Sequence, residues 1–451
     1  MNIYLIMIYL LLILPPILSI SYFTNHTQIV SMIGSLLTVF LSVLILFIPL
    51  SVYAYFDINQ VNRVLIISVS AVYSMSVFFA STYHKGISNP EHLQMHYSLM
   101  HLFTFTMLFT LLINNFGLMW IGIEATTASS ALLLIIERER NQMEAAWRYV
   151  LIVSTGLTIA LISIILLYLN YDSLDASLII SGGHGVSLLL SVAGVTALVG
   201  FGTKIGIFPM HTWLPDAHGE APSEISAMFS GILLPVAAYV LYRFYQATVT
   251  PVVSELFLFF ILFTVIFVAI MMPSQRNLKR MFAYSTMENM ALILLGLITG
   301  GLALIGAILI IITHAFGKSG AFFTSGNIIK SYGTKDMDHI SGLRDRMPSS
   351  AATLLGSSLI VTGAPPFTVF AGELLIFYQL IKNGNYLAVG IIATCLLVIS
   401  LSVISKVSRM IFDGNEKVAE ISRIDMTQGS VAMISFLLGF SITVFFLGGL
   451  I

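Results

Sequence analysis

Long apolar runs follow one another along almost the whole sequence. A run of about 20 apolar residues crosses a bilayer as a helix. Only 9% of the 451 residues are charged and 57% are hydrophobic, whereas soluble domains carry about 25% charged residues. The sequence therefore predicts an all-α polytopic membrane protein with about fourteen transmembrane helices. The predicted spans are residues 2–23, 28–55, 61–83, 95–114, 117–136, 145–170, 187–209, 223–248, 253–273, 280–300, 302–329, 352–381, 385–408 and 429–451.

Basic residues divide unequally between the predicted loops. Most Lys and Arg residues lie in the loops that follow the odd-numbered spans, and only Arg63, Arg243 and Lys382 lie in the loops on the other side. Loops rich in Lys and Arg remain in the cytoplasm. This distribution supports an even number of spans and predicts that both termini lie on the outer side of the membrane.

The composition also limits the chemistry that this chain can perform. A formal net charge of -1 gives no basic surface for nucleic acid. The one cysteine, Cys395, excludes an internal disulfide and a Cys-ligated zinc or iron–sulfur site within the chain. No phosphate loop or nucleophile motif is present, so we predict no catalytic site. Histidines 84, 92, 96 and 101 lack an acid or cysteine at tight spacing, which favours interfacial positions over a metal site.

Six ionisable residues lie at mid-membrane depth in predicted spans, where hydrocarbon disfavours charge by at least about 2.5 kcal/mol. Such residues normally face a water-filled cavity or a partner charge. Structural ion pairs between helices are the alternative, but six titratable groups on five helices exceed what packing requires. The pattern therefore indicates a polar ion path through the membrane. The six residues are Glu124, Lys204, Glu288, His314, Lys318 and Glu373.

Two spans contain helix-breaking residues next to an ionisable side chain. The segment VGFGTKIGIFPMHTWLP contains Lys204, and the segment VTGAPPFTVFAGELL contains Glu373 near its end. Proline removes a backbone donor, and the freed carbonyls are tolerated in a membrane when they line a hydrated cavity. Paired breaks in two halves of a chain indicate a transport site. The breaking residues are Gly202, Pro209, Gly363, Pro365 and Pro366.

The two breaks are separated by nearly the same interval as Glu124 and Glu288, which suggests an internal repeat. Helices 4–8 and 9–13 would then form two five-helix repeats, and an odd helix number makes the second repeat inverted in the membrane. The predicted organisation is three N-terminal helices over 1–94, a first repeat over 95–248, a second repeat over 253–408 and a final helix over 429–451.

Several segments resemble a known family. The segment GTKIGIFPMHTWLPDAHGEAPSEISAMFSGILL (202–234) closely resembles the signature of antiporter-like, proton-translocating subunits. These subunits occur in respiratory complex I, multisubunit Na+/H+ antiporters and group 4 membrane-bound hydrogenases. The resemblance extends to LKRMFAYSTMENMALI, THAFGKSGAFFTSGNI and TGAPPFTVFAGELLI. The phrases HLFTFTMLFTLLINNFGLMWIGIEATT, EAAWRYV and SGILLPVAAYVLYR are most similar to the hydrogenase-4 and formate hydrogenlyase type.

The resemblance implies roles for individual residues. Glu124 matches the glutamate that pairs with the helix 7 lysine, here Lys204, and Glu373 matches the terminal acid on broken helix 12. His314 and Lys318 match the central polar axis, one helical turn apart and so on one helix face. Glu288 and His218 are further candidates for this path. At Pro235 the family motif instead carries a helix 8 lysine, so a relay through helix 8 has to be made by water, His314 or Lys318.

The resemblance also implies partners. Nickel–iron and iron–sulfur centres are expected only in a peripheral redox module of hydrogenase-like large and small subunits, and no cofactor is expected in this chain. Other antiporter-like and small transmembrane subunits are expected beside it in a prokaryotic plasma membrane. The predicted function is proton translocation, with Na+ as an alternative ion, coupled to redox chemistry in the partners through the Glu/Lys/His axis.

Two other functions remain open from the sequence. The first is a subunit of a multisubunit Na+/H+ antiporter that has no redox partner. The second is a structural membrane anchor with a degenerate proton path. Pro235 favours the anchor, whereas the presence of Glu124, Lys204 and Glu373 opposes it.

Overall fold

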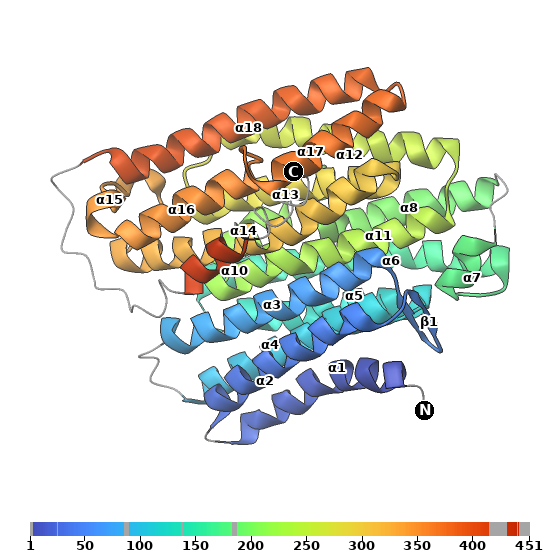
Figure 1. Ribbon diagram of the computed structural model, residues 1–451, viewed down its shortest axis with the longest axis horizontal. Coiled ribbons are helices and arrows are strands. Elements are labelled where there is room, and N and C mark those ends of the chain that lie inside the picture. Colours follow the sequence, from blue (N-terminus) through green and yellow to red (C-terminus); the bar gives the residue numbers. More distant parts are fainter. Residues whose placement is uncertain are drawn as a thin grey trace. The chain divides into compact units, whose positions relative to one another are not determined.

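The structure is a computed structural model that describes residues 3–24, 26–84, 90–136, 139–182, 187–414, 431–439 and 441. Apart from one short hairpin, its elements are helices (Figure 1). The chain divides into two compact units. The first unit contains residues 1–77, 84–213 and 232–260, and the second contains residues 78–83, 214–231 and 261–451.

The first unit is built mainly from long helices that pack in sequence order. Helix α1 packs on α2 and α4, α4 packs on α5, and α6 contacts both α5 and α8. Residues of α11 complete the unit against α8. The helices are α1 (Ile3–Ser19), α2 (Thr27–Leu44), α3 (Gln60–Tyr83), α4 (Pro90–Leu112), α5 (Phe116–Leu134), α6 (Arg140–Tyr171), α7 (Ala176–Ser181), α8 (Leu188–Ile205) and α11 (Leu234–Ala247).

The second unit is arranged around α14, which contacts α10, α13, α16 and α17. Helix α18 packs on α16 and α17 at the side away from α14 (Figure 1). The helices are α9 (Trp213–Glu220), α10 (Ser223–Met228), α12 (Pro251–Met271), α13 (Leu278–Thr299), α14 (Leu302–Tyr332), α15 (Leu343–Arg346), α16 (Pro348–Val361), α17 (Thr368–Lys382) and α18 (Tyr386–Phe412). The first residues of α9 and α12 belong to the first unit.

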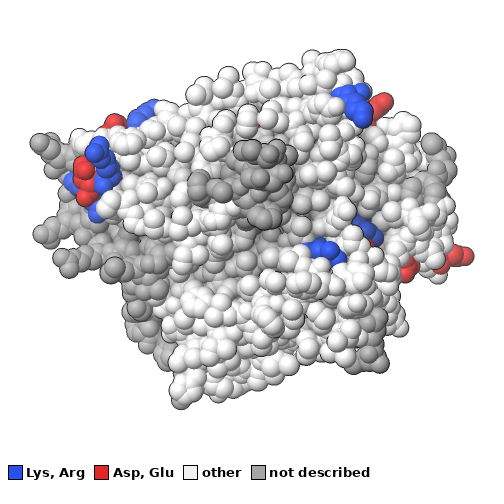
Figure 2. Space-filling view, in the orientation of Figure 1, with Lys and Arg blue, Asp and Glu red and all other residues white. Residues whose placement is uncertain are grey.

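The chain is a multi-pass membrane protein by the length and composition of its helices. Twelve of the described helices are long and apolar enough to span a bilayer. The predicted span 352–381 is two shorter helices, α16 and α17, and residues 431–439 are helical. The rest of the predicted last span lies outside the described residues, so the count of fourteen stays a prediction. In the face drawn in Figure 2, charged side chains form a few small groups on a largely uncharged surface.

The predicted span 28–55 is too long. Helix α2 ends at Leu44, a single 3-10 turn follows over Ile45–Phe47, and Ile48 is extended. Pro49 explains this end, because proline disfavours helical backbone in the residue before it. The apolar residues that follow form an antiparallel hairpin of β1 (Ser51–Tyr53) and β2 (Phe56–Ile58), with Val52 opposite Asp57.

Both predicted breaks are present as interruptions between two helices. Helix α8 ends at Ile205, Gly206 has φ 84°, and α9 begins at Trp213. Helix α16 ends at Val361, Gly363 has φ 63°, and α17 begins at Thr368. Only glycine adopts this left-handed conformation without steric cost, so each glycine allows the chain to leave its helix.

A third irregularity precedes Pro235, the position at which the sequence departs from the family motif. Residues Phe229–Leu233 form a turn of π-helix, and Pro235 lies in the first turn of α11. Proline has no N–H to donate and its ring clashes with the carbonyl four residues earlier. The wider π-helical turn relieves that clash, and Pro235 is fully enclosed among buried residues.

Candidate functional site

Lys204 is the most deeply buried cation of the first unit, in the last turn of α8. Its Nζ donates hydrogen bonds to Thr127 Oγ1 at 2.9 Å and to Tyr149 Oη at 2.6 Å. The same nitrogen lies 4.9 Å from the centre of the Tyr149 ring. Tyr149 in turn shares a hydrogen bond of 2.7 Å with Ser130. Two hydroxyl groups and one aromatic face therefore hold a buried ammonium in place.

Glu124 lies one turn before Thr127 on α5, but its carboxylate is engaged elsewhere. Glu124 Oε1 accepts a hydrogen bond of 2.7 Å from Ser154 on α6, and Oε2 is buried without a hydrogen bond from the described residues. Glu124 and Lys204 interact electrostatically, yet within the described parts of the chain they form no direct salt bridge. The predicted Glu124–Lys204 pair is thus arranged as two neighbours, each with its own hydroxyl partners.

Close helix packing brings Lys204 to these hydroxyl groups. A side chain at Gly200 would collide with the backbone of Ala160 on α6, and one at Gly156 would collide with Thr203 on α8. Small residues let membrane helices approach closely. The two glycines therefore let α8 lie against α6, which carries Tyr149 and Ser154.

The break after α8 is tied to the partners of Lys204 by Trp213. The indole N–H of Trp213 donates to the carbonyl oxygen of Thr203 at 2.8 Å, which satisfies a carbonyl at the end of the helix. The Trp213 and Tyr149 rings lie 4.7 Å apart. The first side chain of α9 after the break is therefore in contact with a hydrogen-bond partner of the lysine.

In the second unit, Lys318 and His314 lie one turn apart on α14, and both are fully buried. Lys318 Nζ donates to the carbonyl oxygen of Phe282 at 3.0 Å. His314 Nε2 lies 3.1 Å from the carbonyl oxygen of Ser230, and its Nδ1 has no hydrogen-bond partner among the described residues. The two predicted residues therefore face backbone oxygens of α13 and of the segment before α11.

The acids of the second unit lie close to the second break. Asn289 Nδ2 donates to Glu288 Oε2 at 3.1 Å and to the carbonyl oxygen of Val361 at 3.0 Å, which places both α13 residues at the end of α16. The carboxylate of Glu373 rests against Gly363, where a Cβ atom would collide with it. Glu373 is 5% exposed, and no described residue donates a hydrogen bond to its Oε1.

His218 is buried in the second unit between aromatic rings. Its ring lies 5.4 Å from that of Phe322 and 5.9 Å from that of Phe229. Neither ring nitrogen has a hydrogen-bond partner within the described part of the chain. A buried polar group is normally hydrogen-bonded, by protein or by water. The two ring nitrogens of His218 therefore have hydrogen-bonding capacity that a water molecule could satisfy.

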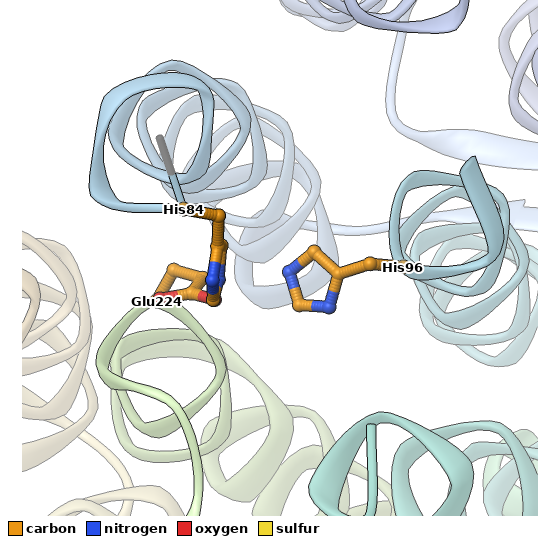
Figure 3. A group of neighbouring side chains, drawn as sticks. All are labelled: His84, His96 and Glu224. Carbon is orange, nitrogen blue, oxygen red and sulfur yellow. The ribbon is translucent and has the colours of Figure 1, made fainter. Parts of the chain in front are cut away.

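Two of the four clustered histidines lie face to edge in the first unit. The rings of His84 and His96 have centres 5.0 Å apart, and Figure 3 draws both side chains. His101 is separately engaged, because its ring nitrogens bond Ser31 and Tyr73. Two imidazoles are fewer ligands than a zinc site uses.

Three residues around Lys204 were missed by the sequence analysis: Thr127, Tyr149 and Ser154. Each is a hydroxyl-bearing residue inside a span, a type that hydrocarbon tolerates well. The detectable signal was the spacing of Glu124, Thr127 and Ser130, three residues apart on α5, which places them on adjacent turns.

Comparisons with known proteins agree with this architecture. Residues 113–400 match the family described as "NADH:quinone oxidoreductase/Mrp antiporter, TM". The chain is similar to the hydrogenase-4 component F homolog of Methylacidiphilum infernorum (isolate V4), with 32% identity over 358 residues that cover 74% of each chain.

Two solved structures have the same fold at low sequence identity. A chain of the membrane-bound sulfane sulfur reductase (MBS), an archaeal respiratory membrane complex, has a TM-score of 0.86 and 21% identity, covering 97% of this chain and 95% of that one. A chain of the Mrp complex from Dietzia sp. DQ12-45-1b also has a TM-score of 0.86, with 17% identity, covering 100% of this chain and 95% of that one.

Proposed function

This chain belongs to the NADH:quinone oxidoreductase/Mrp antiporter transmembrane family, and we propose that it is the proton-translocating subunit of a group 4 membrane-bound hydrogenase or related respiratory complex. Antiporter-like subunits of this family are parts of multi-subunit membrane assemblies. The observation that carries the proposal is the buried ammonium of Lys204, which is held by hydroxyl groups beside Glu124 at a helix break.

That arrangement suits a group that takes up and releases a proton. Hydroxyl partners accept hydrogen bonds from an ammonium and can donate one to a neutral amine, so they can hold Lys204 in both protonation states. A carboxylate salt bridge would favour only the charged state. A movement of Glu124 toward or away from Lys204, driven by a neighbouring subunit, would change how firmly the lysine holds its proton.

The proposed path continues through the second unit. His314 and Lys318 supply titratable groups on α14, His218 supplies a buried imidazole, and Glu373 supplies the acid at the second break. Each of these groups can accept and release a proton, and water can connect groups that do not touch. In this scheme Pro235 contributes no proton carrier, and its π-helical turn exposes no charge.

The redox partner is inferred from the relative with the hydrogenase-4 component F name. Nickel–iron and iron–sulfur centres would lie in peripheral subunits, and this chain would contribute no ligand to them. The plasma membrane of a prokaryote, with both termini outside, is the proposed location. A Na+/H+ antiporter subunit is the second candidate, because the Mrp complex has a chain of the same fold.

Purification separates these two assemblies. The tagged chain would be isolated from its native membrane in mild detergent, and its partners and metals would be measured by mass spectrometry and elemental analysis. We expect nickel, iron and hydrogenase-like subunits. Small membrane subunits without nickel or iron would contradict the hydrogenase proposal and support the antiporter.

A substitution at Lys204 distinguishes an ion-transporting subunit from a structural membrane anchor. Lys204→Ala is expected to abolish ion coupling while the complex still assembles, whereas an anchor would lose nothing. Lys382→Ala is the matched control, because Lys382 is exposed at the end of α17. Unchanged coupling in Lys204→Ala would establish the anchor function.

A further inference from the structure

The end of α16 in the second unit brings two carboxyl groups together without a salt bridge. Glu288 is 1% exposed and Glu373 is 5% exposed, and the two interact electrostatically. Within the described residues, neither forms an ion pair with a Lys, Arg or His. Two ionised carboxylates at close range in a buried place repel each other strongly, as in carboxyl pairs that share one proton.

The oxygen atoms around these acids lack hydrogen-bond donors. Glu373 Oε1 and Asn289 Oδ1 are both buried, and no described residue donates to either. The amide nitrogen of Asn289 is fully committed to the Glu288 carboxylate and to the carbonyls of Ser285 and Val361. Buried acceptors without donors are costly. The site therefore requires a proton or another cation that these oxygens can bind.

One ammonium acts on this site. Lys318 interacts electrostatically with Glu288, although its nitrogen bonds the Phe282 carbonyl. The charged Lys318 balances one carboxylate and leaves the second without a counter-charge. Helix α16 carries no titratable side chain between Pro348 and Val361. The other titratable groups on the elements packed here are Lys279, Arg280, Tyr284, His314, Lys330, Tyr332, Tyr378, Lys382, Tyr386, Cys395, Lys406 and Arg409.

We propose that Glu288 and Glu373, with Asn289, form one cation-binding site that holds a single proton for the two carboxyl groups. The inference deepens the proposed function, because it makes Glu288 a member of the ion path and identifies the ion as a proton. Gly363 is the residue that admits the Glu373 carboxylate to this place.

The ligand supply favours a proton over Na+. A hard metal cation in an oxygen site takes about six ligands. The carbonyl oxygens of Val361, Ser285 and Thr362 each already accept a hydrogen bond, the first two from Asn289 and the third from Ser400 at 2.9 Å, which leaves them fewer lone pairs for a metal ion. One proton needs only a carboxyl oxygen to bind and an acceptor such as Asn289 Oδ1.

A carbodiimide that reacts with protonated carboxyl groups tests the site in the intact complex. Dicyclohexylcarbodiimide would be applied at neutral pH, and mass spectrometry would count labels on this chain. We expect one label per chain, divided between Glu288 and Glu373. In Glu288→Gln or Glu373→Gln, the charged Lys318 balances the one remaining carboxylate and keeps it ionised. Labelling of that remaining acid should therefore fall by roughly tenfold.

Two further variants sharpen the result. Lys318→Met removes the counter-charge, so both carboxyl groups should be protonated and the count should rise toward two. Glu255→Gln is the control, because Glu255 is exposed near the start of α12, and its labelling pattern should match the wild type. Infrared absorption of the protonated carboxyl groups, measured as wild-type-minus-variant spectra, gives the same count without requiring reagent access.

Two outcomes would overturn the inference. Labelling of Glu373 that is unchanged in Glu288→Gln would show two independent acids. Protection of either acid by Na+ at fixed pH would show a sodium site. If the labelling pattern holds but membrane vesicles that contain the whole complex move no protons, the site stands and the proposed transport function fails, so the two failures are distinguishable.

Discussion

The two helix breaks have similar backbone conformations, but a basic side chain lies beside the first and an acidic side chain lies beside the second. Each break has a glycine with positive φ, Gly206 at 84° and Gly363 at 63°, and each contains a cis X-Pro bond. In the first, a lysine precedes the break and has two hydroxyl partners. In the second, an acid follows the break and one of its oxygens has no donor among the described residues.

The two breaks therefore contribute differently to the proposed ion path. At the first break, the Trp213 indole donates a hydrogen bond to the Thr203 carbonyl oxygen, and its ring contacts Tyr149. Lys204 is therefore held in a defined position. The second break has buried acceptor oxygens that receive no hydrogen bond from the described residues. It is therefore suited to bind and release a cation. We expect substitutions at the second break to affect transport, and substitutions around the first to affect both transport and stability.

The largest expected effect is at Gly363. In Gly363→Ala the new Cβ would occupy the place of the Glu373 carboxylate, and positive φ would add about 1–2 kcal/mol of strain. Proton transport by the assembled complex should be lost. Gly384→Ala is the comparison variant, since it carries the same strain with nothing within 4 Å of the added carbon, and it should retain more activity. Equal loss in both variants would show that the acid's position is irrelevant.

A smaller effect, mainly on stability, is expected where α6 and α8 meet. Gly200→Ala would force the helices apart, because its Cβ would meet the Ala160 backbone, and overpacking costs about 1–3 kcal/mol. Thermal unfolding in detergent would show a lowered midpoint. Gly390→Ala on α18 is the control, since nothing lies within 4 Å of the added carbon. A Gly200→Ala protein as stable as this control would mean that the helices can separate freely.

The next effect concerns the hydroxyl groups that hold Lys204. Tyr149→Phe removes one acceptor of the ammonium and leaves the ring, which should cost about 1.5–3 kcal/mol of the lysine's stabilisation. Transport should slow while the complex remains assembled. Tyr168→Phe tests the same change at an exposed position of α6. If both variants transport at the wild-type rate, the Tyr149 hydroxyl has no role in proton movement.

The smallest effect is expected at Trp213. Trp213→Phe keeps an aromatic ring against Tyr149 but loses the hydrogen bond to the Thr203 carbonyl, which is worth about 0.5–1.5 kcal/mol. A modest decrease in thermal stability should accompany a small change in transport rate. Complete loss of transport would instead show that this hydrogen bond controls the lysine.

Much of this arrangement was predictable from the sequence, for identifiable reasons. Pro209 and Pro365 signal breaks because proline disrupts a regular helix, and a charge such as Lys204 is conspicuous in an apolar span. Gly202, also predicted as a breaking residue, lies inside α8, and the helix ends at Gly206 instead. Hydropathy alone extended the second span through Pro49, because apolar residues of the β1–β2 hairpin resemble helix residues in composition.

The partners of the charges were not predictable in the same way. Which hydroxyl group meets Lys204 depends on how closely α6 and α8 approach, and that distance is set by Gly156 and Gly200 on different helices. The contact between Gly363 and Glu373 depends on the direction in which α17 leaves the break. Such facts arise from tertiary packing and have no local sequence pattern.

Proton uptake by vesicles that contain the whole complex tests directly whether Lys204 and Glu373 carry protons across the membrane. Wild type, Lys204→Ala and Glu373→Gln would be compared, with Lys382→Ala as the control for a lost surface charge. We expect the two buried variants to lose redox-driven proton movement while the redox reaction itself continues, and we expect Lys382→Ala to match the wild type. Wild-type proton uptake in both buried variants would show that neither Lys204 nor Glu373 carries the proton.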